Sequence, residues 1–297
     1  MLTLFSTPKP FHGHIGIIQR NAIQSWKRVH PEVEVILFGD EEGAAEICRE
    51  FGLRHVPFVP KNEFGTKLLR GIFEPAQQMA RHDILCYLNC DIMLVPSFAA
   101  ALKRTASSFP QFLMVGQRCD VDLTEPWDFA AAGWDRKLEA FATEHGSLHD
   151  RTGIDYFAFS RGMFTDMPPL VIGRIWWDHW LVWHARSLHS PVVDATRVTT
   201  ALHQNHDYGY HPAGAGGVWR DEQSQKNFEL AGGKWHLYTI DDATHRLAAD
   251  KIGRSLSYPF APFRRASRPY IAPLWFKFLD FTRPVRRLVG LRRRALP

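Results

Sequence analysis

Cysteine is scarce in this sequence. Its four cysteines include no C-x-x-C pair, so the sequence predicts neither a zinc ribbon nor the disulfide framework of a small secreted domain. Cys86 and Cys90 lie in an apolar run, where free thiols behave as small hydrophobic groups. We therefore expect free thiols and a reducing, cytoplasmic environment.

Long apolar runs are missing as well. No stretch approaches the length of about 20 apolar residues that a membrane-spanning helix needs. The N-terminal MLTLFSTPKP also lacks a basic leader followed by an apolar segment. The sequence therefore predicts neither a secretion signal nor a membrane-spanning anchor.

Basic residues are few outside the C-terminal segment. Residues 251–297 hold twelve Lys and Arg against one acid, for a net charge of +11, whereas residues 1–250 carry −6. The pI of about 9.1 thus comes from the tail, which argues against nucleic acid as a partner of the whole chain. We predict one domain at 1–250, with halves 1–115 and 116–250, and a basic tail at 251–297.

Strand-like and helix-like patterns alternate along the first half of the chain. The predicted strands cover residues 2–6, 33–38, 54–59 and 83–88, and the predicted helices cover 17–29, 44–51 and 68–81. The second half adds strands at 112–115, 156–159 and 192–194, an aromatic helix at 175–186, and a glycine-rich loop at 213–217. Helices that connect successive strands imply right-handed crossovers. We therefore predict an α/β fold with a mostly parallel central sheet and helices on both faces.

Polar side chains follow these predicted strands. Thr7 comes after the first strand, Asp40 after the second, and Asn89 and Asp91 after the fourth. Ligands of parallel sheets bind beyond the carboxyl ends of the strands. These residues therefore mark the predicted ligand site.

The segment YLNCDIML places Asn89 and Asp91 two residues apart where a buried strand ends. On an extended backbone both side chains can face the same way, and two such oxygen donors suit a hard divalent cation that substrate phosphates bridge. The alternative is a strand-end turn, in which Asn and Asp are turn formers.

The segment RIWWDHWLVW sets Asp178 among four tryptophans. A carboxylate in aromatic surroundings loses solvation, so its pKa should rise toward the range of a general base. Aromatic rings such as that of Trp177 also stack on sugar faces. The alternative is that the tryptophans belong to the core and that Asp178 caps the helix or pairs with Arg174.

The segment ALHQNHDYGYH holds His203, His206, Asp207 and His211. Imidazoles are common ligands of transition metals, although these spacings do not match the helical zinc pair of HExxH. One histidine acting as a metal ligand is the interpretation we prefer. The alternative is a polar loop whose histidines bind backbone carbonyls.

The segment GIDYFAF places Asp155 ahead of an apolar strand. Gly153 would let the backbone approach a ligand closely, and a structural turn explains the segment equally well.

These segments, in this order, resemble the GT-A superfamily of nucleotide-sugar-dependent glycosyltransferases over most of residues 1–210. In that superfamily a strand ends in a DxD-type motif that binds the metal and the donor diphosphate. The equivalent here is Asn89-Cys90-Asp91, in which Asn is a neutral and weaker ligand than the first Asp. Asp91 is therefore the expected direct ligand, and Asn89 is expected to touch ribose or a metal-bound water.

The resemblance also implies roles for other residues. Asp178 stands where inverting members have their general base. His203 is the first candidate, and His206 the second, for the histidine that completes the metal shell. By the same resemblance the nucleotide contacts are Thr7, Asp40 and Thr66, and the expected acceptor contacts are Asp155, Trp177 and His206.

The function implied is transfer of a sugar from a UDP- or GDP-sugar to an acceptor hydroxyl, with inversion and with Mn²⁺ or Mg²⁺. Residues 255–297 place aromatic residues beside clustered arginines, which suits an anionic membrane surface. The acceptor is then a lipid-linked molecule or a glycan of polysaccharide biosynthesis, and the enzyme lies on the inner face of the membrane. The alternative is a tail packed on the catalytic domain.

Two other functions are consistent with the sequence. A metal-dependent hydrolase built on His203, His206, Asp207 and His211 predicts zinc and no need for a nucleotide. A catalytically inactive GT-A-like protein predicts nucleotide binding without turnover. A sugar-1-phosphate nucleotidyltransferase is disfavoured, because no glycine-rich loop with basic residues follows the first strand.

Overall fold

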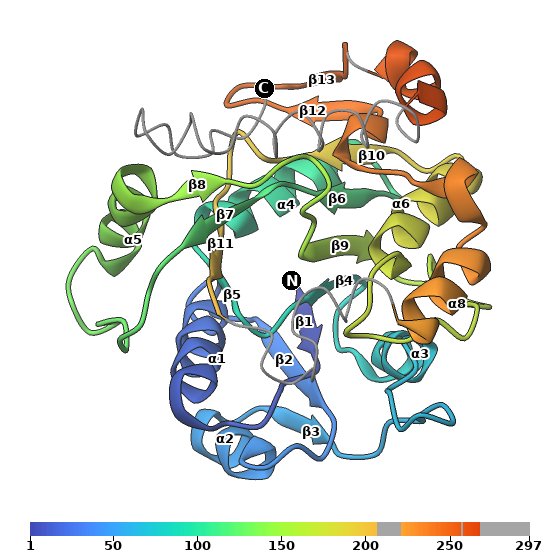
Figure 1. Ribbon diagram of the computed structural model, residues 1–297. Coiled ribbons are helices and arrows are strands. Elements are labelled where there is room, and N and C mark those ends of the chain that lie inside the picture. Colours follow the sequence, from blue (N-terminus) through green and yellow to red (C-terminus); the bar gives the residue numbers. More distant parts are fainter. Residues whose placement is uncertain (207–220, 257, 268–297) are drawn as a thin grey trace, which may run out of the picture.

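A mixed nine-stranded sheet forms the centre of the protein in the computed structural model, which describes residues 1–206, 221–256 and 258–267 (Figure 1). From one edge to the other its strands are β13 (Ile252–Arg254), β12 (His245–Leu247), β10 (Val192–Asp194), β6 (Leu113–Val115), β9 (Tyr156–Ser160), β4 (Ile84–Leu88), β1 (Thr3–Ser6), β2 (Glu34–Phe38) and β3 (Arg54–Val56). Five of the eight neighbouring pairs are parallel, and three are antiparallel. The predicted α/β class and mostly parallel central sheet are confirmed.

The antiparallel strand β9 lies between β4 and β6. Leu88 at the end of β4 pairs with Tyr156 at the start of β9, so Asp155 stands at the same edge as the carboxyl ends of β1, β2 and β4. This edge therefore collects Thr7, Asp40, Asn89 and Asp155 from separate parts of the sequence.

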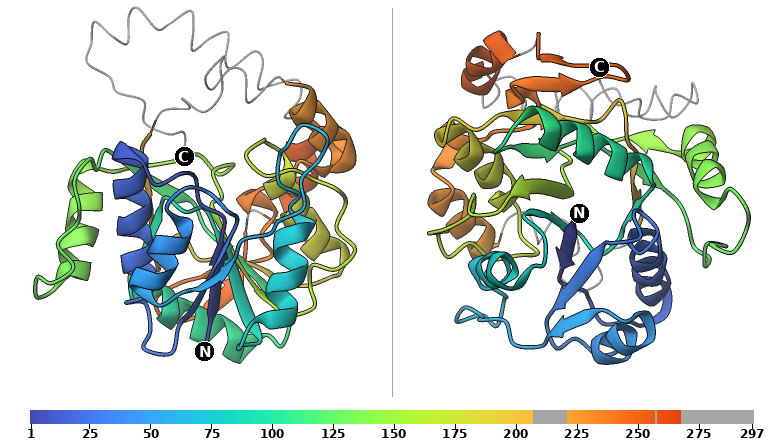
Figure 2. Two further views of the ribbon diagram at one scale, coloured as in Figure 1. Left: turned by 90° about the horizontal axis from the view of Figure 1, so that it is seen from below. Right: turned by 180° about the vertical axis from the view of Figure 1, so that it is seen from behind.

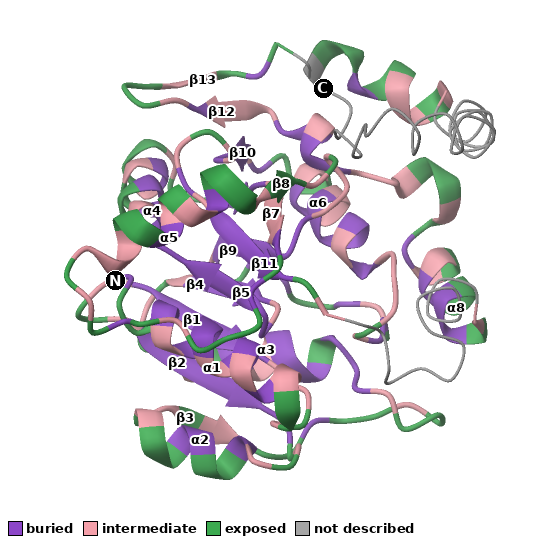
Figure 3. Ribbon diagram, turned by 60° about the vertical axis from the view of Figure 1, so that its left-hand side comes forward, coloured by how far each residue is buried: buried purple, intermediate pink, exposed green. Residues whose placement is uncertain are grey.

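Helices cover both faces of this sheet. Along β1, Leu4 packs on one face and Phe5 on the other, because side chains alternate along a strand. One face carries α3 (Arg70–Met79) and α6 (Trp177–Ser187), whose side chains join the cluster around Phe5. The other face carries α1 (Gly13–Trp26), α2 (Ala44–Phe51) and α4 (Ser97–Ser108). The central strands between these two layers, from β10 to β2 in the order above, are mostly buried (Figure 3).

A second, four-stranded sheet lies beside the first and was not predicted from the sequence. Its order is β5 (Ile92–Leu94), β11 (Ala201–Gln204), β7 (Arg118–Val121) and β8 (Ser147–Leu148). Helix α5 (Trp134–His145) packs Leu138 and Ala142 against it and lies at the periphery of the molecule (Figure 2). The chain passes from the large sheet to the small one between β4 and β5, and the segment Asn89-Cys90-Asp91 is that corner.

The predicted helix bounds are correct for α2 and differ from the observed ones for other helices. α2 has the predicted bounds, because Gly52 ends it with a φ of 63° in the left-handed region that glycine adopts readily. α1 begins four residues earlier than predicted, at Gly13, and α6 begins two residues later than predicted, at Trp177.

The C-terminal part of the described chain stays with the sheet. β13 extends the sheet beyond the predicted domain boundary at residue 250, after α8 (Glu222–Leu230) and the short helices η1 (Gly233–His236) and η2 (Ile240–Asp242). A further short helix, η3, covers Tyr258–Phe260, and helical residues follow it up to residue 267. Within the described ranges, no helix has the length and apolarity needed to cross a membrane. The predicted loop at 213–217 and the tail from residue 268 lie outside the described residues.

Candidate metal and nucleotide site

The small sheet brings His203 next to Asp91. In β11, His203 pairs with Ile92 of β5 on one side and with Asp120 of β7 on the other. The next backbone amide, that of Gln204, donates a hydrogen bond of 3.3 Å to the carbonyl of Asp91. The motif at the end of β4 and the histidine segment are therefore neighbours in space.

Asp91, His203 and His206 form a group that fits a cation, with one donor atom from each lying within 4.8 Å of the others. His206 Nε2 lies 3.1 Å from Asp91 Oδ2. Asp91 Oδ1 is buried and has no hydrogen-bond partner among the described residues, and a buried carboxylate oxygen left unpaired is costly. One carboxylate and two imidazoles are ligands for a divalent transition metal, so these residues fit the metal that the resemblance implies.

The charges around Asp91 favour its ionised form. Burial alone would raise its pKa, but a hydrogen bond from His206 and the positive charges of His203 and Lys9 hold the pKa of Asp91 well below its usual range. A metal ligand must be deprotonated to bind. Asp91 is therefore in the deprotonated form that a metal ligand needs at neutral pH.

Lys9 is a cation of this site that the sequence analysis missed. It follows β1, and its Nζ lies 3.0 Å from His206 Nε2. Its position after the first strand is the signal that selected Thr7, and the same criterion applied two residues further along would have found it.

A layer of charged residues from β7 and beyond supports His203. Asp120 Oδ1 lies 3.2 Å from His203 Nδ1, while Asp120 Oδ2 lies 2.7 Å from His149 Nδ1. Burial tends to lower the pKa of His203, but the carboxylates of Asp120 and Asp91 hold it above its ordinary value. Arg118 Nε lies 2.8 Å from Asp120 Oδ1, the oxygen that faces His203. A carboxylate behind an imidazole fixes the orientation of the ring. This role of Asp120 was not predicted, because β7 itself was not.

Asp120→Asn is expected to weaken Mn²⁺ binding by about tenfold or more, because an amide holds the His203 ring less firmly than a carboxylate does. Isothermal titration with Mn²⁺ measures the effect. Asp122→Asn is the matched control, since Asp122 is exposed and contacts Asn205 instead of His203. An equal affinity of the two variants would contradict this role of Asp120.

The three predicted nucleotide residues gather around the loop that residues 61 and 67 close by pairing with each other. Thr7 Oγ1 accepts a hydrogen bond of 2.6 Å from Lys67 Nζ. Asp40 is exposed and lies 3.7 Å from Lys61, and the backbone amide of Thr66 donates to Asn62 Oδ1 at 2.9 Å. The ends of β1 and β2 and this loop thus form one polar surface.

Lys67 is a second cation that the sequence analysis missed. It is 8% exposed and pairs with Glu41 as well as with Thr7. Burial lowers the pKa of Lys67, and the contact with Glu41 opposes that shift. Nothing in the spacing of the loop marks this lysine as buried, so its role follows from tertiary structure alone.

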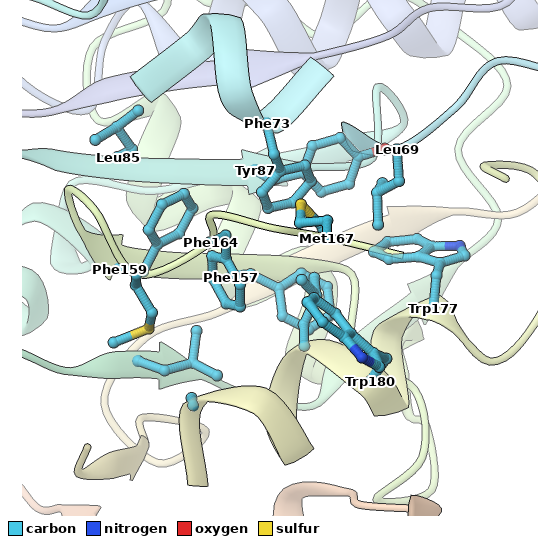
Figure 4. Close-up of a cluster of buried hydrophobic side chains, with 14 of the residues drawn as sticks. Leu69, Phe73, Leu85, Tyr87, Phe157, Phe159, Phe164, Met167, Trp177 and Trp180 are labelled. Carbon is cyan, nitrogen blue, oxygen red and sulfur yellow. The ribbon is translucent and has the colours of Figure 1, made fainter. Parts of the chain in front are cut away.

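The aromatic segment at the start of α6 is mainly core. Trp177 and Trp180 are 6% and 4% exposed, and the Trp177 ring packs edge-on against Tyr87 (Figure 4). The ring therefore has no free face for an acceptor sugar. Because the Tyr87 hydroxyl donates to Asn89 at 3.3 Å, Trp177 connects the start of α6 with the corner after β4.

Asp178 follows Trp177 in the first turn of α6 and is half-buried. Arg174 pairs with Asp221 at 2.5 Å and not with Asp178, and within the described chain the Asp178 carboxylate has neither hydrogen bond nor ion pair. The residue before the helix, Trp176, has a φ of 86°, which is strained for a tryptophan. Such strain concentrates at functional sites.

Two other predicted acceptor residues have different partners. His206 belongs to the group around Asp91. Asp155 is 7% exposed and accepts hydrogen bonds from Asn89 and Arg118. Asp207 and His211 of the histidine segment lie outside the described residues.

Comparison with known proteins identifies similar folds and no relative by sequence. No protein-family model and no curated protein matches the chain. Solved structures similar to it include GT-A glycosyltransferases. Glucosyl-3-phosphoglycerate synthase from Mycobacterium tuberculosis, in complex with Mn²⁺, UDP and phosphoglyceric acid, matches 78% of this chain and 79% of its own, at 14% identity and a TM-score of 0.47.

Two further structures are similar over shorter parts. The mannosyltransferase PcManGT from Pyrobaculum calidifontis, in complex with GDP-Man and Mn²⁺, matches 71% of this chain and 58% of its own, at 14% identity and a TM-score of 0.41. TarS 1–349 from S. aureus matches 69% of this chain at 8% identity and a TM-score of 0.42. The chain spans 57% of the length of that TarS structure and 36% of the length of the same protein in complex with UDP.

Proposed function

We propose that this chain is a glycosyltransferase, which transfers a sugar from a nucleoside-diphosphate sugar to an acceptor hydroxyl with the help of a divalent cation. The proposal rests on one observation. Asp91, His203 and His206 lie close together beside the strand ends that hold Thr7 and Asp40. Nucleotides bind at this edge of α/β sheets. The motif resemblance to the GT-A superfamily points to the same reaction.

The donor set favours Mn²⁺ over Mg²⁺. Mg²⁺ takes oxygen ligands almost exclusively, whereas imidazole suits transition metals, and two of the three candidate ligands are histidines. When bound, the cation would neutralise charge that builds up on the leaving diphosphate. Lys9, whose ammonium is 3.0 Å from His206, would add positive charge at the same place.

The nucleotide would lie along the polar surface formed by Thr7, Asp40 and Thr66. Lys67 beside Thr7 adds a charged donor to that surface. Asp178 would accept the proton of the acceptor hydroxyl as that hydroxyl attacks the anomeric carbon from the face opposite the diphosphate. The anomeric configuration would then be inverted.

A thermal-shift screen with UDP and GDP, each with and without Mn²⁺, tests this function. A ligand at a hundred times its Kd stabilises by about 2.7 kcal/mol, which corresponds to a rise in melting temperature of about 5 °C or more in a chain of this size. We expect one of the two nucleotides to give this rise only when Mn²⁺ is present.

Other outcomes of the screen support the rivals. Stabilisation by Zn²⁺ without any nucleotide is the result expected of a metal-dependent hydrolase, for which a carboxylate and two imidazoles are also suitable ligands. Nucleotide binding without release of the diphosphate from any UDP- or GDP-sugar is the result expected of an inactive GT-A-like protein.

We also propose that the C-terminal region contacts an anionic membrane surface on the cytoplasmic side. Leu256, Phe260 and Phe263 lie close together in the sequence and are 87%, 64% and 74% exposed. Grouped exposed apolar side chains mark contact surfaces, whereas single ones do not. Arg265 pairs with the buried Asp242 and lies 4.1 Å from the Tyr238 ring, so this segment is fixed to the domain. The strongly basic sequence after it would attract acidic lipids, which fits a lipid-linked acceptor or a growing polysaccharide.

Flotation with liposomes tests the membrane contact. Full-length protein in which Leu256, Phe260 and Phe263 are replaced by Ser is expected to float several-fold less with phosphatidylglycerol vesicles than the wild type does, and neither protein is expected to float with neutral vesicles. The exposure of the three side chains keeps the effect on folding small. Equal flotation of the two proteins would count against the proposal.

A further inference from the structure

Both polar atoms of the Asn89 side chain are hydrogen-bonded to other residues. Its Nδ2 donates a hydrogen bond of 2.6 Å to Asp155 Oδ1, and its Oδ1 accepts from the Tyr87 hydroxyl at 3.3 Å. Asp91, two residues later, contacts His206. The two side chains of the motif therefore serve different partners.

The backbone fixes Asn89 and Asp155 close to each other. The amide of Asn89 donates to the carbonyl of Asp155 at 3.0 Å, directly after the pairing of Leu88 with Tyr156. Since β4 and β9 are central strands of the sheet, neither residue can move away from the other without breaking the ladder.

Asp155 already places a carboxylate beside the side chain of Asn89. It is 7% exposed, and its second oxygen accepts from Arg118 Nη1 at 2.7 Å. Arg118 is shared with Asp120, so one guanidinium serves two carboxylates. A further carboxylate, at residue 89, would lie within hydrogen-bond distance of Asp155. Arg118 already serves two carboxylates, and two like charges this close, one of them on the buried Asp155, repel strongly.

We infer that position 89 carries an amide because Asp155 supplies the carboxylate there, and that Asn89 and Asp155 form a matched pair that positions Asp91. Asn89 is then a positioning residue and not a weakened metal ligand. The inference rests on the proposed function only in so far as Asp91 binds a metal.

Exchange of the two side chains tests the pair. Asn89→Asp is expected to lower the melting temperature and to weaken Mn²⁺ binding by about tenfold or more, as the loss of a residue that orients a ligand does. The double variant Asn89→Asp/Asp155→Asn restores one amide and one carboxylate. It is expected to regain a Mn²⁺ affinity within about threefold of the wild type and most of the melting temperature. Gln111→Glu, an exposed amide-to-acid change, controls for the added charge.

The opposite results overturn the inference. A weakened ligand predicts that Asn89→Asp binds Mn²⁺ more tightly than the wild type does, and this outcome, or unchanged affinity and melting temperature, would contradict the pair. If Asn89→Asp does not fold, the double variant still tests the pairing. If the two positions acted independently, Asp155→Asn could not rescue Asn89→Asp, and the double variant would fail to fold as well. If the wild type binds no Mn²⁺, the proposed function fails, whereas the order of melting temperatures still tests the pairing.

Discussion

Asp178→Asn is expected to lower the rate of sugar transfer by about a thousandfold while leaving the affinity for the nucleoside diphosphate unchanged. Removal of a general base costs about 10² to 10⁴ in rate, and asparagine keeps the size of the side chain. Asp178 is in the first turn of α6, behind the strained Trp176, while the nucleotide is expected at the ends of β1 and β2. The two halves of the site should therefore respond separately.

The control for this variant is Asp135→Asn. Asp135 also lies in the first turn of a helix, α5, so both substitutions remove a carboxylate from a helix N-terminus, where it is favourable. Transfer assays with saturating donor and titration of the diphosphate measure the two properties. Normal turnover of Asp178→Asn, or a loss no larger than that of the control, would remove Asp178 from the reaction.

Asp91→Asn is expected to weaken Mn²⁺ binding by at least about a hundredfold, more than the tenfold to hundredfold that residues behind the ligands contribute. The substitution removes the only carboxylate of the candidate ligand group and leaves two neutral or positive imidazoles beside Lys9. Metal-dependent binding of the diphosphate should be lost to the same extent, because a cation held by Asp91, His203 and His206 would supply the positive charge that attracts the phosphates.

Asp83→Asn is the matched control for Asp91→Asn, because Asp83 stands at the opposite end of the same strand and its side chain is 93% exposed. Titration of Mn²⁺ with and without diphosphate gives both affinities. A variant at Asp91 that binds Mn²⁺ as tightly as the control would show that the metal lies elsewhere.

The large sheet could be predicted because its strands carry their own signal. β2 and β4 are apolar runs bounded by turn residues, and α2 lies between a positive-φ glycine at each end. The parallel order follows from the alternation of strands and helices. The direction of β9 does not, because its pairing with β4 and β6 joins segments far apart in the sequence.

The small sheet could not be predicted because all four of its strands are short and one of them carries charged side chains. β8 has two residues, and β7 carries Arg118 and Asp120. Such strands exist only through pairing with distant segments, which is a tertiary effect. The proximity of His203 to Asp91 was therefore suggested by the family resemblance, and Asp120 and Arg118 were missed altogether.

Aromatic periodicity predicted the helix at α6 but not which side each ring takes. Trp177 was expected to face an acceptor and is instead packed against Tyr87 and Phe157. The start of the helix moved to Trp177 because Trp176 leaves the helical region.

An anomalous difference map at the manganese edge would locate the metal. The crystals are grown with Mn²⁺ and the diphosphate that the thermal-shift screen selects. We expect one strong peak within about 2.0 to 2.3 Å of ligand atoms of Asp91, His203 and His206, with the diphosphate beside it. A peak bound by other residues, or a bound nucleotide with no metal beside Asp91, would contradict it.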